Sequence, residues 1–361
     1  MGADGNVRAA LGRALASWAR VALSLAVADE RDLELKLPLE LSEPSMLPGL
    51  DLVLDVTGPA RVTGAAAGVP VLADGSAVPL ARCPVVRVGA LQVRMTPFPF
   101  MVPGHAAGLP GLDYQREQQP LATAAYTLIR ENLSETFGEM AVSCRVLAMK
   151  TYRASDFVNQ THSHFPGGAM LSSFQNPYEI ADKLVHEWAH DRLFALEDEG
   201  PFLDPDDGPE ENTYSPWRDD PRPIQGVLHA SYVHVQVWPF WRGVHGSTPK
   251  PDVTALARDR LVRYTQQILI GVHQLGRSAR LTARGEALVA WISERAAAFG
   301  RDVTALGLGP DVPAHFVTGD GEIVPVRRAD GAPLSVGAVL EAHARRCGGM
   351  DAIAPLASRC A

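Results

Sequence analysis

The stretch FQNPYEIADKLVHEWAHDRLFALEDEG, residues 174–200, carries the strongest structural signal in the chain. It begins with Asn176, a residue type that caps helices well, and Pro177 suits the first helical position that follows. Glu179 stands three residues after the cap, which is the spacing of a capping box. The stretch therefore predicts a helix over residues 177–199.

This helix contains HEWAH, residues 186–190, which fits the pattern HExxH. Residues four apart lie above one another on a helix, so His186 and His190 can offer two imidazole nitrogens to one divalent transition metal. Glu187 is turned by about 100° around the helix axis, and we expect it to orient a ligand or act as a base rather than bind the ion. The pattern has only three fixed positions, so its context has to support it.

The amino-terminal side of the chain changes its pattern at about residue 33. Residues 6–29 have a helical pattern. From residue 33 to residue 101, short Val/Leu runs alternate with Gly and Pro turns, which predicts a strand-rich module. A Pro/Gly-rich linker follows at residues 98–113.

The carboxyl-terminal side is mainly helical by pattern. Residues 200–223 are acidic and Pro-rich, which is typical of a loop. Further helices are predicted at residues 121–140, 252–276, 281–299 and 336–346. Short strand-like pieces surround Phe316 and Ile323.

These elements predict an α+β protein in which a strand-rich amino-terminal module packs on a mainly helical metal-binding region. We divide the chain into an N-terminal helix with the strand-rich module (residues 1–110), a helical HExxH region (111–300) and a C-terminal extension that packs on the core (301–361). With 361 residues, of which 46% are hydrophobic, the chain is long enough for a large core. The sequence leaves the oligomeric state open.

The charge balance argues against nucleic acid as a partner. The formal net charge is -8, from 33 Lys and Arg against 41 Asp and Glu, and no basic run stands out. The four cysteines form no CxxC pair, which favours reduced thiols in a cytoplasm. We expect neither a signal peptide nor a membrane partner, because polar residues interrupt the apolar stretch 14–28 and no apolar run is long enough to cross a bilayer.

A zinc peptidase is one way to complete the HExxH pair. It needs a third ligand and an open position for a water that Glu187 activates. Glu210 and Glu211 are the candidate ligands, but both stand in DPDDGPEENTYSP, which has no helical pattern and is a poor frame for a ligand. The HxxGxxH extension of the metzincins does not follow the motif.

The other completion uses YSPWRDDPRPIQGVLHA, residues 214–230. His229 lies there in an apolar stretch, where an imidazole is best explained by a partner or a metal. Arg218 and Arg222 precede it in a segment stiffened by prolines. Because a guanidinium pairs bidentately with a carboxylate, this completion favours an anionic acid that chelates the ion over a peptide bond.

The blocks HEWAH and SPWRDDPRPIQGVLHA, in this order, make the chain resemble a known family over residues 160–245, about a quarter of its length. The family is the HExxH-motif peptide-modification proteins, the α-ketoglutarate-dependent HExxH non-haem iron enzymes of ribosomal peptide natural-product pathways. The second block is much more distinctive than the first.

The resemblance implies an Fe(II)- and α-ketoglutarate-dependent dioxygenase that uses O2 to hydroxylate a side chain of a ribosomally made precursor peptide, and we expect the reaction at Cβ. It implies His186, His190 and His229 as iron ligands. This set departs from the commoner triad of two histidines and one carboxylate.

Further roles follow from the same resemblance. It implies Arg218 or Arg222 as the partner of the distal carboxylate of α-ketoglutarate, and it gives Glu187 the role of orienting a ligand. Two alternatives stay open: a zinc metallopeptidase with Glu187 as general base, and a non-catalytic peptide-binding protein with a structural metal site.

Several neighbouring residues are weaker candidates. Ser172 and Ser173 precede the motif helix and can donate hydroxyl hydrogens to a bound acid, although ordinary loop serines fit the pattern equally well. His162 and His164 in QTHSHFPGG are candidates for the substrate pocket, and so is Trp217. The simpler interpretations are exposed loop histidines and a core tryptophan.

His234 is set aside at this point. It follows His229 by five residues, so on a helix we expect its side chain to point elsewhere. The run VHVQVW, residues 233–238, also fits a strand with its valines inward.

Overall fold

The chain divides into two compact units, which we describe separately. The computed structural model describes residues 22–23, 25–41, 45–46, 52–54, 60–66, 69–78, 80–96, 111–151, 159–163, 165–204, 212–278 and 280–357. Unit 1 comprises Met1–Val86, Gln92–Gln119 and Val146–Lys150, and unit 2 comprises Arg87–Leu91, Pro120–Arg145 and Thr151–Ala361. Our three-part division of the sequence stays a prediction, because compactness does not show which segments fold independently.

Two small antiparallel sheets lie in unit 1. One has the strand order β1-β4-β5, from β1 (Leu33–Leu41), β4 (Ala60–Ala66) and β5 (Val69–Leu72). The other has the order β2-β3-β6, from β2 (Ser45–Met46), β3 (Leu52–Leu54) and β6 (Leu80–Arg82). In β4, Val62 and Ala65 are buried with Leu23 and Val78 in one apolar cluster. The predicted strand-rich module is confirmed here.

A four-stranded sheet has the order β10-β9-β8-β7. Its strands are β7 (Val85–Val88), β8 (Leu91–Met95), β9 (Val146–Thr151) and β10 (Gly168–Ser173). β8 and β9 are parallel, with Arg94 opposite Val146. Such a pair needs a long crossover connection, and α2 (Leu112–Asn132) and α3 (Ser134–Ser143) stand between the two strands in sequence.

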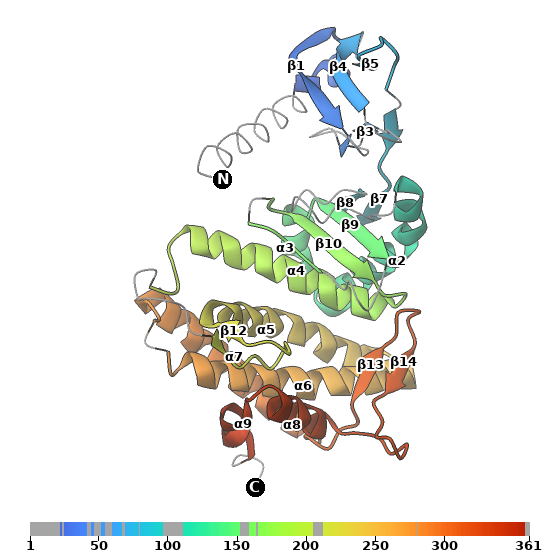
Figure 1. Ribbon diagram of the computed structural model, residues 1–361. Helices are drawn as coiled ribbons and strands as arrows, with labels where there is room; N and C mark the ends of the chain where they lie inside the picture. Colours follow the sequence, from blue (N-terminus) through green and yellow to red (C-terminus); the bar gives the residue numbers. More distant parts are fainter. Residues whose placement is uncertain are drawn as a thin grey trace. The chain divides into compact units, whose positions relative to one another are not determined.

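Four long helices form the body of unit 2: α4 (Pro177–Asp198), α5 (Ile224–Ser247), α6 (Pro251–Leu275) and α7 (Ala283–Ala305). α5 packs against both α4 and α6, and Figure 1 shows it between them. The hairpin of β13 (His315–Val317) and β14 (Ile323–Pro325) packs on α6, together with α8 (Val336–Arg346) and α9 (Met350–Ala357). Two short strands, β11 (Asn212–Thr213) and β12 (Arg222–Pro223), pair just before α5.

Most of the predicted elements have counterparts in this fold. The α+β class is confirmed, and the motif helix is α4, whose ends agree with the prediction to within one residue. The predicted helix 121–140 is two helices, α2 and α3. The run 233–238, for which strand and helix were both open, belongs to α5. The predicted helix 6–29 and linker 98–113 lie largely outside the described residues.

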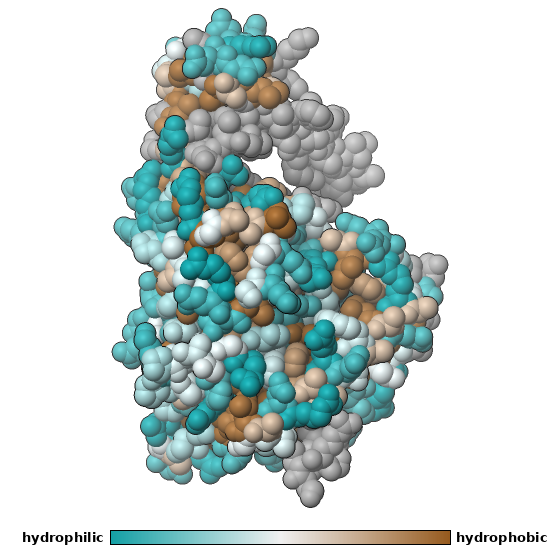
Figure 2. Space-filling model, turned by 180° about the vertical axis from the view of Figure 1, so that it is seen from behind, coloured by the Kyte–Doolittle hydropathy of each residue, from teal (hydrophilic) through white to brown (hydrophobic). Residues whose placement is uncertain are grey.

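No helix in the described ranges is long and apolar enough to span a bilayer. On the face in Figure 2, hydrophobic residues form separate small patches among hydrophilic ones.

Candidate metal centre

Helix α4 carries the two motif histidines as its sequence predicts. The side chain of Asn176 caps the helix by accepting hydrogen bonds from the backbone N–H groups of Tyr178 (3.0 Å) and Glu179 (3.3 Å). With the start of the helix set in this way, His186 and His190 face the same side, and their ring centroids are 5.0 Å apart.

Helix α5 adds two more imidazoles to the same place. The ring centroid of His229 is 5.8 Å from that of His190, and the centroid of His234 is 5.4 Å from that of His186. All four side chains line one pocket of about 810 Å³. Its other lining residues are Asn159, Gln160, Thr161, Lys183, Glu187, Phe194, Ser215, Trp217, Arg218, Arg222, Pro223, Gln225, Gly226 and Ala230.

His229 is held by a carboxylate from α4. Its Nε2 lies 2.9 Å from Oε1 of Glu197. Burial alone would raise the pKa of Glu197, but the hydrogen bond and charge of His229 outweigh it and the pKa is lowered. An ionised Glu197 accepts the Nε2 proton, so the Nδ1 lone pair of His229 is left to bind an ion. Metal-binding histidines commonly donate their other N–H to a carboxylate in this way.

His234 lines the pocket, which corrects our expectation that it points elsewhere. Its Nδ1 lies 2.7 Å from the carbonyl oxygen of Ala230, and its ring stacks on Trp217 at a centroid distance of 5.1 Å. Burial lowers the pKa of His234 to about 4, so the ring is neutral at pH 7. The pocket wraps around enough of α5 to include both His229 and His234, although they are five residues apart.

The motif histidines are also uncharged. Burial is the main cause that lowers the pKa of His190 to about 3, and it lowers the pKa of His186 well below 6.5. The Nδ1 atom of His190 is buried and has no hydrogen-bond partner among the described residues. Neutral imidazoles with an unused nitrogen are the form that binds transition metals, so these residues fit the predicted ion.

The ring nitrogens of the predicted ligands His186, His190 and His229 do not all lie within 4.8 Å of one another. Among the described residues, only Asp219, His343 and Cys347 form a group of three whose ligand atoms all lie within 4.8 Å of one another. His186, His190 and His229 therefore share a pocket with their rings near each other, but not with all three nitrogens inside that limit. The hydrogen bond of His229 to Glu197 fixes the orientation of one of these rings.

Glu187 is 3% exposed and lines the same pocket. It accepts a backbone hydrogen bond from Thr161, and burial raises its pKa to about 8. Glu187 therefore lies in the same pocket as the histidines, and its role there stays a prediction.

The two predicted arginines both line the pocket, in different surroundings. The side chain of Arg218 is 61% exposed and that of Arg222 is 34% exposed. Asp220 pairs with both, at 3.4 Å from Nε of Arg218 and 3.0 Å from Nη2 of Arg222. The Nε atom of Arg222 is buried and has no hydrogen-bond partner among the described residues. Arg222 is therefore the better placed of the two to receive an anion.

A buried network of charged groups ties α4 to α5 and α6, and the sequence analysis missed it. Oδ2 of Asp182 on α4 accepts hydrogen bonds from Trp241 Nε1 (2.6 Å) and Tyr264 Oη (2.8 Å). Lys183 Nζ lies 2.9 Å from Oδ1 of the same carboxylate and 3.3 Å from Glu179 Oε1. Because Lys183 also lines the pocket, the network fixes one wall of it.

The network continues on α6. Arg260 Nη2 lies 3.2 Å from Oε2 of Glu179 on α4. Asp259 accepts two hydrogen bonds of 2.7 Å from Arg263 and one of 2.6 Å from the backbone N–H of His315. Three carboxylates face three cations in this network, which satisfies the rule that buried charges are paired.

Three further predicted residues, Ser172, Ser173 and His162, do not line the pocket. Ser172 and Ser173 are buried in β10 and are not among the residues that line it. His162 is half-buried and does not line it either. His164, Glu210 and Glu211 lie outside the described residues.

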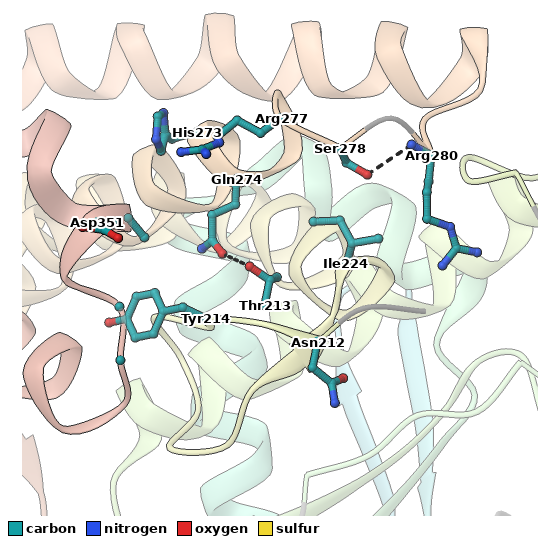
Figure 3. A pocket seen from close by; sticks show the side chains of 13 residues that line it. Asn212, Thr213, Tyr214, Ile224, His273, Gln274, Arg277, Ser278, Arg280 and Asp351 are labelled. Atoms are coloured by element: carbon teal, nitrogen blue, oxygen red, sulfur yellow. Dashed lines mark hydrogen bonds between the residues drawn. The ribbon is translucent and has the colours of Figure 1, made fainter. Parts of the chain in front are cut away.

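A second pocket, of about 670 Å³, lies in unit 2 between β11, the carboxyl end of α6 and the start of α9 (Figure 3). Thr213 donates a hydrogen bond to Gln274 across it. It contains none of the residues predicted from sequence. Its wall includes Tyr214, which also contacts His343.

Comparison with models of protein families and with curated proteins finds no match to this chain.

The third ligand can be tested by substitution. We expect His229→Ala to abolish the Fe(II) binding that we propose for this pocket below, because the hydrogen bond of His229 Nε2 to Glu197 leaves Nδ1 to bind an ion. We expect His234→Ala to keep it, because a neutral carbonyl holds that ring. Anaerobic calorimetric titration with Fe(II) measures both. Loss of binding in His234→Ala alone would assign the third position to His234.

Proposed function

We propose that the protein is an Fe(II)- and α-ketoglutarate-dependent oxygenase that hydroxylates a side chain, at Cβ, of a ribosomally made precursor peptide. The observation that carries the proposal is the shared pocket, which imidazoles from α4 and α5 line together with Arg222, whose Nε is buried and has no hydrogen-bond partner among the described residues. The proposal also rests on the resemblance of the HEWAH and SPWRDDPRPIQGVLHA blocks.

The donors suit the proposed ion. Imidazole nitrogens bind iron and zinc alike, and His186, His190 and His229 would hold the metal. Bound iron lets α-ketoglutarate and O2 react, so that α-ketoglutarate yields succinate and CO2 and one oxygen atom enters a substrate C–H bond. The protein's own residues bind and orient the reactants around that ion.

Arg222 would bind the distal carboxylate of α-ketoglutarate. Its guanidinium is already oriented in the pocket by Asp220, and its free Nε can add a charge-assisted hydrogen bond to an incoming carboxylate. Trp217, stacked on His234, forms part of the wall of the same pocket.

The proposed cellular setting is a cytoplasm that keeps thiols reduced. Among the described residues, Cys144 and Cys347 form no disulfide, which supports this setting.

The function is tested by succinate formation. Purified protein with added ferrous iron, α-ketoglutarate and air should produce succinate, slowly without peptide and faster with a substrate peptide that gains one oxygen atom in its mass spectrum. Absence of succinate with iron bound in the pocket would contradict the proposal.

Arg222→Ala is expected to raise the KM for α-ketoglutarate by about 10- to 100-fold, the value of one or two charge-assisted hydrogen bonds. Arg218→Ala should raise it much less, because the Arg218 side chain is mostly in solvent. Initial rates of succinate formation at varied α-ketoglutarate measure both values. The opposite ranking would assign the carboxylate to Arg218.

A zinc metallopeptidase is the second candidate, and one observation favours it. Glu187 lies in the pocket with its pKa raised to about 8 by burial, and an environment-shifted glutamate is typical of a general base. The oxygenase and the peptidase predict different effects on activity when Glu187 is replaced.

A further inference from the structure

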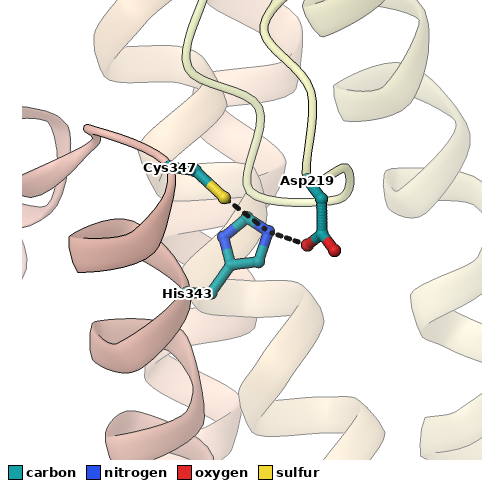
Figure 4. Close-up of side chains that lie close together, drawn as sticks. All are labelled: Asp219, His343 and Cys347. Atoms are coloured by element: carbon teal, nitrogen blue, oxygen red, sulfur yellow. Dashed lines mark hydrogen bonds and ion pairs between the residues drawn. The ribbon is translucent and has the colours of Figure 1, made fainter.

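Side chains of three metal-binding types meet at the carboxyl end of α8, away from the histidine pocket (Figure 4). His343 and Cys347 are four residues apart, so they lie on one side of the helix end. Asp219 reaches them from the segment between β11 and β12. Within the described part of the chain, no other group of His, Cys, Asp or Glu is as compact. None of the three lines the pocket that contains the HExxH histidines.

The distances match those between ligands of one ion. His343 Nε2 lies 3.3 Å from Asp219 Oδ1 and 3.8 Å from Cys347 Sγ. In a tetrahedral zinc site, bond lengths of about 2.0–2.1 Å to nitrogen and oxygen and about 2.3 Å to sulfur put the nitrogen about 3.3 Å from the oxygen and about 3.5 Å from the sulfur. The cluster therefore needs only small side-chain shifts to surround an ion.

A nucleophilic triad does not fit the same residues. In a triad of thiol, imidazole and acid, the nucleophile and the acid contact different ring nitrogens. Here the thiol of Cys347 and the carboxylate of Asp219 both face Nε2 of His343. The other nitrogen, Nδ1, lies 2.8 Å from the hydroxyl of Tyr214. Two side chains that face the same ring nitrogen are arranged as ligands of one ion and not as a proton relay.

Tyr214 completes the arrangement. With an ion at Nε2, the proton of His343 sits on Nδ1 and is donated to the Tyr214 oxygen. Such an outer partner fixes the ring orientation of a metal-binding histidine.

The guanidinium of Arg346 would compete with a metal ion for the carboxylate of Asp219. Nη2 of Arg346 lies 2.6 Å from Asp219 Oδ1, and the two side chains are 63% and 75% exposed. Ion pairs at this exposure stabilise little, so a divalent cation held by three ligands can displace the guanidinium into solvent.

We propose that Asp219, His343 and Cys347 bind one Zn²⁺ ion, with solvent in the fourth position. A thiolate with an imidazole selects zinc over calcium and magnesium. On binding, the S–H bond of Cys347 breaks, its proton passes to solvent and the thiolate sulfur bonds to the ion.

The ion would connect two parts of unit 2. Asp219 lies in the segment that also carries Trp217, Arg218 and Arg222 into the histidine pocket. A bond between this segment and α8 would restrict the movement of that pocket wall. The proposal is independent of the reaction assigned to the histidine pocket.

The test is titration of the reduced, metal-free full chain with Co²⁺, a spectroscopic substitute for zinc. A thiolate bound to Co²⁺ gives a charge-transfer absorption band in the near ultraviolet. We expect the band to saturate at one equivalent in a His190→Ala background, which weakens the other pocket. Added Zn²⁺ should abolish it by displacing the Co²⁺.

Matched variants identify the ligands. Cys347→Ser and His343→Gln should lose the band, whereas Cys144→Ser should keep it, because burial raises the pKa of that thiol to about 12. Tyr214→Phe should keep the band and weaken Co²⁺ binding by about tenfold. Asp219→Asn changes an exposed residue and should also weaken binding without unfolding. Absence of the band in the wild type, or a band that survives Cys347→Ser, would overturn the proposal.

Discussion

Replacing His190 by alanine is expected to abolish Fe(II) binding in the histidine pocket and, with it, succinate formation. The residue supplies one of the two imidazoles that α4 presents 5.0 Å apart, and a divalent ion does not bind tightly to the ligands that remain. Anaerobic titration with Fe(II) and the succinate assay measure the two losses.

Glu187→Gln is the matched substitution on the same helix, and it separates the two candidate functions. Removing a general base lowers a rate by about 10²- to 10⁴-fold, so a peptidase would lose nearly all peptide cleavage. An oxygenase needs no base at this position, and we expect succinate formation to fall by about tenfold through a less well oriented ligand. Peptide cleavage by the wild type that disappears in Glu187→Gln would replace the oxygenase with the peptidase.

Asp259→Asn is expected to cost about 3–5 kcal/mol of unfolding free energy, the usual effect of removing one partner from a buried ion pair. The side chain is fully buried and accepts two hydrogen bonds from Arg263. The amide would remove the carboxylate that pairs with Arg263 and one of the two carboxylates that face Arg260. Denaturant unfolding followed by circular dichroism measures the change.

Glu341→Gln is the control for this experiment. Glu341 forms an ion pair with Arg345 on the surface of α8, and such pairs contribute at most about 0.5 kcal/mol. A similar loss in both variants would mean that the network does not stabilise the helices.

The same carboxylate gives a pH dependence. Burial alone would raise the pKa of Asp259, but Arg263 and Arg260 lower it below the usual value. A lowered pKa means that the stabilisation is complete above the unfolded pKa of about 3.9 and is lost as the pH falls through the folded value. The gap in stability between wild type and Asp259→Asn should therefore shrink below about pH 4.

The elements predicted well are those with local signals. The start of α4 follows from an asparagine cap and the proline after it, and these need no information from the rest of the chain. α5 has no comparable signal, because it is buried on several sides and its apolar residues show no single stripe. Pro239 inside that helix weakens the helical pattern further.

The candidate site was predicted in part for the same reason. The four-residue spacing of His186 and His190 is a local feature of α4, whereas the closeness of His234 to His186 depends on how α4 and α5 pack. The buried network joins Glu179 on α4 to Arg260 on α6, and no sequence pattern links positions so far apart. Local rules predict which residues share a helix face, and packing decides which faces meet.

The pairing of Asp220 with Arg222 has a consequence for ligand affinity. A free carboxylate that binds Arg222 through Nη2 as well as Nε has to displace Asp220, which the chain already holds 3.0 Å from Nη2. A tethered group of this kind acts at an effective concentration in about the millimolar range, so it behaves as a built-in competitive inhibitor. The fraction of pockets that an organic acid occupies then depends on how far the concentration of that acid exceeds the effective concentration of the Asp220 carboxylate.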